Sequence, residues 1–172
     1  LYFPVRGRFF YDHPLGVVVN AAVSGGSMWP PMFEGFGRQQ MNLTGLQQCA
    51  HVLQQRGALV GIHPEGTRNK SDDALAFLKA RGGIGRVLQA SDPDVLVLPF
   101  FMSGLTNDFV SEVRQNFRRP GERGKPIVLA WGKPTRVGDL ALDRAPVVVA
   151  RELLEGIRDL GRSALAEAPA AV

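Results

Sequence analysis

The middle of the chain contains the stretch Ala58-Leu59-Val60-Gly61-Ile62-His63-Pro64-Glu65-Gly66-Thr67-Arg68. Its first five residues form a short apolar run that leads to a proline, a pattern typical of a buried strand that ends in a turn. The last six residues combine a rigid proline, a glycine, a hydroxyl, a carboxylate and a guanidinium. Because α/β sheets bind their ligands beyond the carboxyl ends of the strands, we expect the functional site at this turn.

Helices are predicted on both sides of this stretch. The helix before it has apolar residues at helical spacing between 43 and 53, Asn42 or Thr44 as its N-cap, and Gly57 as a stop signal. The helix after it is predicted to begin near Ser71 or Asp72. Its apolar positions are Leu75, Leu78, Val87 and Leu88.

Two further strands and a final helix complete the predicted pattern. The strands are expected over 95–101 and 127–131, and the helix over 149–164 has a single apolar stripe. Strands that alternate with helices predict an α/β fold, with a largely parallel sheet flanked by helices. No repeat or linker divides the chain, so residues 1–172 are predicted to form a single domain.

The composition is that of a globular domain, with 45% hydrophobic and 21% charged residues among 172. The longest apolar runs, 15–23 and 95–102, are far shorter than the roughly 20 residues that span a bilayer, so the chain contains no transmembrane helix. The single cysteine, Cys49, closes no internal disulfide and is expected to be a small core residue. No metal site is predicted.

The net charge of +4 favours anionic partners. Part of the excess lies in a basic stretch over 114–125 that can meet nucleic acid, a phosphorylated substrate or an anionic lipid surface, or that is simply a solvated loop. Its basic residues are Arg114, Arg118, Arg119, Arg123 and Lys125.

The turn after the central strand has the chemistry of a phosphate site. A guanidinium such as that of Arg68 bonds two phosphate oxygens at once, and the Thr67 hydroxyl and the Gly66 backbone complete the cradle. Glu65 is suited to accept hydrogen bonds from a sugar or glycerol hydroxyl, or to orient Arg68. The alternative is an ordinary turn with a Glu–Arg pair on the surface.

The segment from Gly61 to Arg68 resembles the Phe-Pro-Glu-Gly-Thr-Arg block of the glycerolipid acyltransferase family, which includes the 1-acylglycerol-3-phosphate acyltransferases. The family also has a helix that ends in glycine before the block and a later apolar strand with an internal proline, as over 95–100 here. Arg38 lies where the family's second block ends in an arginine. The resemblance covers about Leu1 to Gly104. It departs from the family at His63, at Asn69, and in the interrupted apolar run before Arg38.

The resemblance implies a glycerol-3-phosphate acyltransferase-like fold with a mixed, largely parallel sheet. It implies transfer of an acyl group from acyl-CoA or acyl carrier protein to a hydroxyl of a lysophospholipid such as 1-acylglycerol-3-phosphate, without a cofactor or metal. Arg68, Thr67 and Gly66 are then expected to hold the acceptor phosphate and Glu65 the glycerol, with added charge from Arg38. The expected partners are the lysophospholipid, the acyl thioester and an anionic membrane surface but no nucleic acid, at the cytoplasmic face of a membrane.

The family's catalytic His-x-x-x-x-Asp block is missing from the sequence, because the residues five positions after its three histidines are Val18, Arg56 and Arg68. We expect the block upstream of Leu1, so that the chain as given is an inactive fragment. A relative that has lost catalysis is the competing explanation. A non-catalytic module that binds anionic lipid or phosphate, or an acyltransferase with another lyso-lipid acceptor, is the alternative function.

Three other patterns have two interpretations each. The apolar cluster Met28 to Phe33 with Phe36 is either core packing or a surface for an acyl chain or membrane. Asp12 and His13 are adjacent, which disfavours a catalytic dyad. The glycines over 82–85 lack the strand and the third glycine of a dinucleotide fingerprint.

Overall fold

The computed structural model describes residues 1–35, 37–67, 71, 73–105, 114, 117 and 127–168. Arg68, Asn69, Asp72 and Phe36 lie outside the described residues, as does the basic stretch over 114–125 apart from Arg114 and Phe117. The predictions made for those residues therefore stay predictions.

The N-terminal half begins with a strand and a small group of helices. It contains β1 (Val5–Arg6), α1 (Gly7–Phe10), α2 (Pro14–Val18), a π-helix η1 (Val19–Val23), β2 (Pro31–Met32) and α3 (Gln39–Val52). β1 pairs with β2 in parallel, and Tyr2 forms a parallel bridge with Val60. The segment 2–6 therefore lies between β2 and the central apolar run.

The C-terminal half is built on a two-stranded ribbon and two helices. Its elements are α4 (Gly83–Gln89), β3 (Leu96–Val97), β4 (Phe100–Ser103), β5 (Val128–Trp131), β6 (Thr135–Arg136), a 3₁₀ turn η3 (Val137–Asp139) and α6 (Pro146–Glu167). β3 pairs with β6 and β4 with β5, both antiparallel. Between the two pairs, the Gly132 N–H donates to the Pro99 carbonyl over 2.9 Å.

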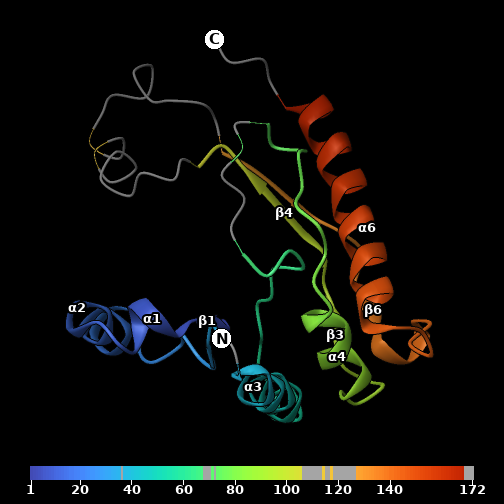
Figure 1. The fold of residues 1–172 in the computed structure, drawn as a ribbon. Coiled ribbons are helices and arrows are strands. Elements are labelled where there is room, and N and C mark those ends of the chain that lie inside the picture. The colour runs from blue at the N-terminus through green and yellow to red at the C-terminus, as the bar shows by residue number, and fades with distance from the viewer. Residues whose placement is uncertain are drawn as a thin grey trace.

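The core lies around α4, which packs between α3 and α6. One buried cluster joins Cys49 and Ala50 of α3 to Val87 of α4, and a second joins Leu88 to Val137 and Val149. Figure 1 shows α6 along the ribbon at one end of the molecule, with α1 and α2 at the other end.

The predicted α/β class is confirmed in its coarse form, since helices and short strands are mixed along the chain. The described strands form three two-stranded sheets, two of them antiparallel, and not one largely parallel sheet. In the C-terminal half β5 runs antiparallel to β4, and among the named strands only β1 and β2 of the N-terminal half pair in parallel. Within the described residues, the predicted strand 58–62 forms one isolated bridge, in which Leu59 and Gly61 bond the backbone of Tyr2 on either side of Val60.

Two helix boundaries differ from the prediction. α3 begins at Gln39, because Asn42 accepts from the Phe33 N–H and donates to the Phe33 carbonyl, both over 2.8 Å, and so does not cap a helix. It ends at Val52, five residues before Gly57.

The second predicted helix begins at Gly83 and not near 71. The N–H groups of the residues before it are bonded outside a helical pattern. The Leu75 N–H donates to the Asp73 carboxylate over 2.9 Å, and the Arg81 N–H donates to the Pro64 carbonyl over 2.7 Å. These bonds fix a turn where the spacing of Leu75 and Leu78 predicts a helix. The last helix is confirmed as α6, with Val149 and Leu154 buried.

Candidate functional site

The turn after the central apolar run is fixed by its backbone. Gly66 has φ +69°, a left-handed conformation that favours glycine, and its N–H donates to the His63 carbonyl over 2.9 Å. The Glu65 carboxylate accepts from the Leu78 N–H, and the Pro64 carbonyl accepts from Arg81. The turn is therefore anchored to the segment over 73–81, and Glu65 is one of the groups that anchor it.

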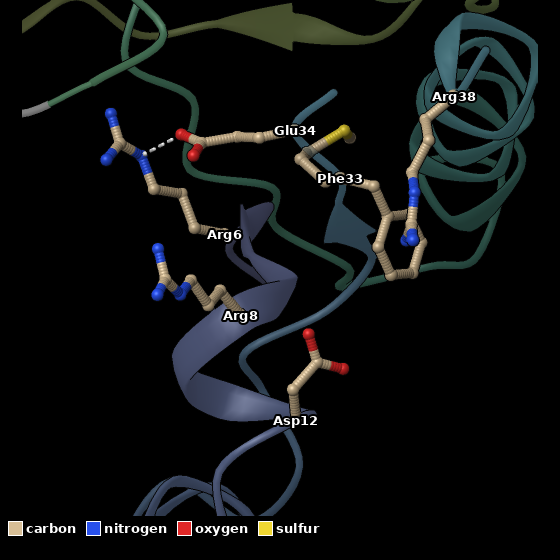
Figure 2. A pocket seen from close by; sticks show the side chains of 7 residues that line it. Arg6, Arg8, Asp12, Phe33, Glu34 and Arg38 are labelled. Carbon is tan, nitrogen blue, oxygen red and sulfur yellow. Dashed lines mark ion pairs between the residues drawn. The ribbon is translucent and has the colours of Figure 1, made fainter. Parts of the chain in front are cut away.

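Thr67 is joined to the N-terminal strand. The Arg6 guanidinium donates from Nη2 to the Thr67 hydroxyl over 3.1 Å, and its Nε lies 3.1 Å from the Glu34 carboxylate. Figure 2 shows this ion pair at the mouth of a pocket, with Arg8 beside Arg6. Arg6 thus links the turn at 64–67 to the loop that follows β2.

Arg6 and Glu34 both line a pocket, which we call the arginine pocket. It has a volume of about 280 Å³. A neighbouring hollow of about 360 Å³ shares Arg6, Arg8 and Glu34 with it and adds Phe9 and His13. The residues that line the arginine pocket are Arg6, Arg8, Asp12, Met32, Phe33, Glu34 and Arg38.

Arg38 reaches the pocket from the N-cap position of α3. Its guanidinium lies over the Phe33 ring, 5.4 Å from the centroid, a cation–π arrangement visible in Figure 2. The two hydrogen bonds from Asn42 hold the Phe33 backbone. Asn42 therefore positions Arg38 through the Phe33 ring.

The pocket has an excess of positive charge, since three arginines face the two carboxylates of Asp12 and Glu34. Within the described ranges, Arg6 is the one pocket arginine with an ion pair, and Arg8 and Arg38 have none. Guanidinium groups bond phosphate and carboxylate oxygens in pairs. The arrangement is suited to bind a small anionic group.

The structure brings together part of the predicted site. Thr67 and Arg38 are connected through Arg6, which bonds the first and lines the same pocket as the second. Glu65 points its carboxylate at the Leu78 backbone, and Gly66 forms the turn. Sequence reasoning missed Arg6 and Arg8, although two arginines inside the apolar opening segment are a signal of a polar function there.

The other predicted patterns have structural roles. Cys49 is fully buried in the core, as predicted, and burial raises the pKa of its thiol from 9.0 to about 11. The cluster at 28–33 packs on α3, since Pro30 and Met32 lie against Gly45, which agrees with the core interpretation. Gly85 gives room for the start of α6, because a Cβ there would lie 2.1 Å from the Pro146 carbonyl oxygen.

Among the described residues, no cluster of three or more His, Cys, Asp or Glu side chains is arranged to hold a metal ion. His13 stacks on Phe9 at 5.9 Å between ring centroids. None of the helices in the described part of the chain has the length and apolar character needed to cross a membrane.

The chain was compared with protein-family models, with curated proteins and with solved structures, and none of the three comparisons found a match.

Proposed function

We propose that this chain is the acceptor-binding part of an O-acyltransferase that moves an acyl group from acyl-CoA or acyl carrier protein to a lysophospholipid hydroxyl. The observation that supports it most is the bond between Arg6 and Thr67, because it joins the Glu-Gly-Thr-Arg turn to a pocket with two further arginines. A phosphate monoester is the part of such an acceptor that arginines bind best.

Each residue near the pocket has a role in this proposal. Arg6 and Arg38 bind the acceptor phosphate, together with Arg68 and the Thr67 hydroxyl. Arg8 adds positive charge at the same mouth. Glu65 holds the turn through Leu78, so its proposed contact with the glycerol requires its second carboxylate oxygen.

The chemical step in this proposal uses a general base on a His-x-x-x-x-Asp block upstream of Leu1. The histidine takes the proton of the acceptor hydroxyl, the oxygen attacks the thioester carbonyl, and the C–S bond breaks. The thiolate that leaves takes the proton back from the histidine. The glycerol-3-phosphate acyltransferase-like sheet belongs to the same proposal, as does a peripheral position at the cytoplasmic face of a membrane.

A non-catalytic module that binds anionic lipid or phosphate is the second candidate. It is favoured by the absence of a His-x-x-x-x-Asp pattern from all 172 residues. The two candidates share the arginine pocket and differ in whether a base acts on the bound acceptor.

The experiment is an acyl-transfer assay with lysophosphatidate and an acyl-CoA, on residues 1–172 and on a polypeptide extended upstream of Leu1. The proposal expects turnover from the extended polypeptide and none from residues 1–172, since general-base catalysis contributes roughly 10²–10⁴-fold. Lysophosphatidate binding by both polypeptides without turnover by either supports the binding module instead.

The acceptor site is tested on the active polypeptide with Arg68→Ala. Loss of a charge-assisted pair is expected to raise the Michaelis constant for the acceptor about tenfold, with that for the thioester unchanged. Arg68→Lys restores part of the loss, because an ammonium keeps the charge but not the two-pronged contact. Arg86→Ala, at an exposed position on α4, is the matched control. An unchanged acceptor constant in Arg68→Ala rejects the phosphate role.

A further inference from the structure

The segment from Pro14 to Val23 forms a helical arm with an inverted pattern of burial. It contains α2 and η1 and has no charged residue. Among its residues with a described side chain, Gly16 and Asn20 are buried, whereas Leu15, Val17 and Val18 are exposed, with 59%, 46% and 60% of their surfaces open to solvent. A helix on the surface of a soluble protein has the opposite pattern, with apolar residues inward.

Specific contacts hold the arm in this orientation. α2 approaches α1 so closely at Gly16 that a Cβ there would lie 1.8 Å from the Phe9 carbonyl oxygen. Asn20 is 8% exposed, and its side-chain oxygen accepts from the Met28 N–H over 3.3 Å and from the Ser24 hydroxyl over 3.0 Å. The Tyr11 hydroxyl donates to the Met28 carbonyl over 2.6 Å. The inward face of the arm is thus fixed by a close contact at Gly16 and by polar bonds, and Leu15, Val17 and Val18 face outward.

The arm packs against α1 at Phe9, which lines the charged hollow beside the arginine pocket. Phe9, 45% exposed, lines that hollow together with Arg6 and Arg8. Figure 1 shows α1 and α2 at one end of the molecule, away from α6. An apolar surface bordered by arginines matches an anionic phospholipid layer, whose acyl chains and phosphates lie side by side.

We propose that the arm over 14–23 inserts its apolar face into the interface of an anionic bilayer and so holds the arginine pocket at the level of the lipid phosphates. Its ten residues are too short to span a bilayer and are suited to lie in the interface plane. This inference extends the proposed function, because it states how a lysophospholipid in a membrane reaches the pocket. It does not require acyl transfer.

The test is co-sedimentation of the full chain with vesicles of phosphatidylcholine and phosphatidylglycerol in equal parts. The double variant Leu15→Glu with Val18→Glu is expected to lower the partition coefficient at least tenfold, because two exposed apolar side chains that would enter the bilayer are replaced by carboxylates that anionic lipid repels. The matched control is Leu129→Glu, since Leu129 is 55% exposed on β5. It is expected to sediment like the unsubstituted chain.

A second readout follows insertion directly. A solvent-sensitive fluorophore on Val18→Cys, in a chain with Cys49→Ala, is expected to shift to the blue when vesicles are added. The same label on Leu59→Cys, at a site 62% exposed, is expected not to shift.

Three results overturn the proposal: equal sedimentation of the arm variant and the unsubstituted chain, equal loss in Leu129→Glu, or a label at position 18 that does not respond. Self-association without vesicles that the arm variant abolishes also overturns it, because a second copy then covers this face. These vesicles contain neither lysophosphatidate nor thioester. Failure here therefore leaves the proposed acyl transfer standing, and failure of acyl transfer leaves this result intact.

Discussion

The N-terminal and C-terminal halves of the molecule differ in the contacts that fix each of them. In the C-terminal half the backbones of packed elements approach closely, as at Gly85 against Pro146 and at Gly161, where a Cβ would lie 2.6 Å from the Phe101 ring. The N-terminal half also has a close backbone contact, at Gly16 against Phe9. Around the pocket, however, the contacts that fix its structure are polar: the two bonds from Asn42 to the Phe33 backbone, and the bonds of Arg6 to Thr67 and Glu34.

This difference suggests that the C-terminal half mainly stabilises the fold, whereas the pocket in the N-terminal half binds a ligand. The close contacts in the C-terminal half leave no room for an added side chain, because well-packed interiors resist changes of volume. The bonds of Arg6 to Thr67 and Glu34 are exposed, so a ligand can take their place, as we propose for a phosphate that replaces Glu34 at Arg6. We therefore expect substitutions in the first region to change stability, and substitutions at the pocket to change binding.

The largest effect on stability is expected from Gly85→Ala. The new Cβ would meet the Pro146 carbonyl oxygen, a backbone atom that cannot move aside, so α4 and α6 must separate. Unfolding by urea is expected to show a loss of about 3 kcal/mol, at the upper end of overpacking costs. Gly156→Ala on α6 is the control, since nothing lies within 4 Å of its Cβ position. It is expected to add about 0.5–1 kcal/mol through helix propensity, and equal effects at the two sites contradict the packing argument.

A smaller loss, about 2 kcal/mol, is expected from Asn42→Ala, because the Phe33 N–H and carbonyl both lose a partly buried partner. Phosphate binding should weaken as well, since Arg38 rests on the Phe33 ring. Thr44→Ala, at an exposed position two residues further along α3, is expected to change stability by less than about 0.5 kcal/mol. An unchanged melting temperature and unchanged phosphate binding in Asn42→Ala would show that the two bonds from Asn42 to the Phe33 backbone are not needed.

The smallest effect is a pH dependence from Cys49. Burial raises the pKa of its thiol from 9.0 to about 11, so the folded chain keeps a proton that the unfolded chain loses. Between these pH values the folded state binds more protons than the unfolded state, and the free energy of unfolding falls as the pH rises. Alkylation by iodoacetamide is therefore expected to be slow at pH 9 in the native chain and fast in urea. Equal rates in the two states contradict the burial of Cys49.

Local patterns in the sequence predicted some elements well and others poorly. The helix α6 follows from the helical spacing of its apolar residues, and the strand β5 from a short stretch bounded by Pro126 and Gly132. The segment 73–81 has apolar residues at helical spacing but forms turns, since Glu65 and Pro64, more than ten residues away, take up its N–H groups. Pairing between distant segments cannot be derived from the period of either one.

The site shows the same limit. Thr67 and Gly66 could be singled out because they follow an apolar run within a few residues. Arg6 stands out only as an arginine in an apolar segment, and its contact with Thr67 could not be predicted, because it joins residues 61 positions apart. Arg38 was predicted from a resemblance, and the structure adds that it lines the same pocket as Arg6.

The central claim is that the arginine pocket binds a phosphate monoester beside the turn at 64–67. Isothermal titration of the full chain with a short-chain alkyl phosphate tests it most directly, with Arg6→Gln as the variant. Arg136→Gln is the control, since Arg136 is an equally exposed arginine at the other end of the molecule. We predict binding by the unsubstituted chain and the control, and an affinity at least tenfold lower in Arg6→Gln, because a charge-assisted contact is lost. Equal affinity in all three proteins, or no binding by any, would contradict the account.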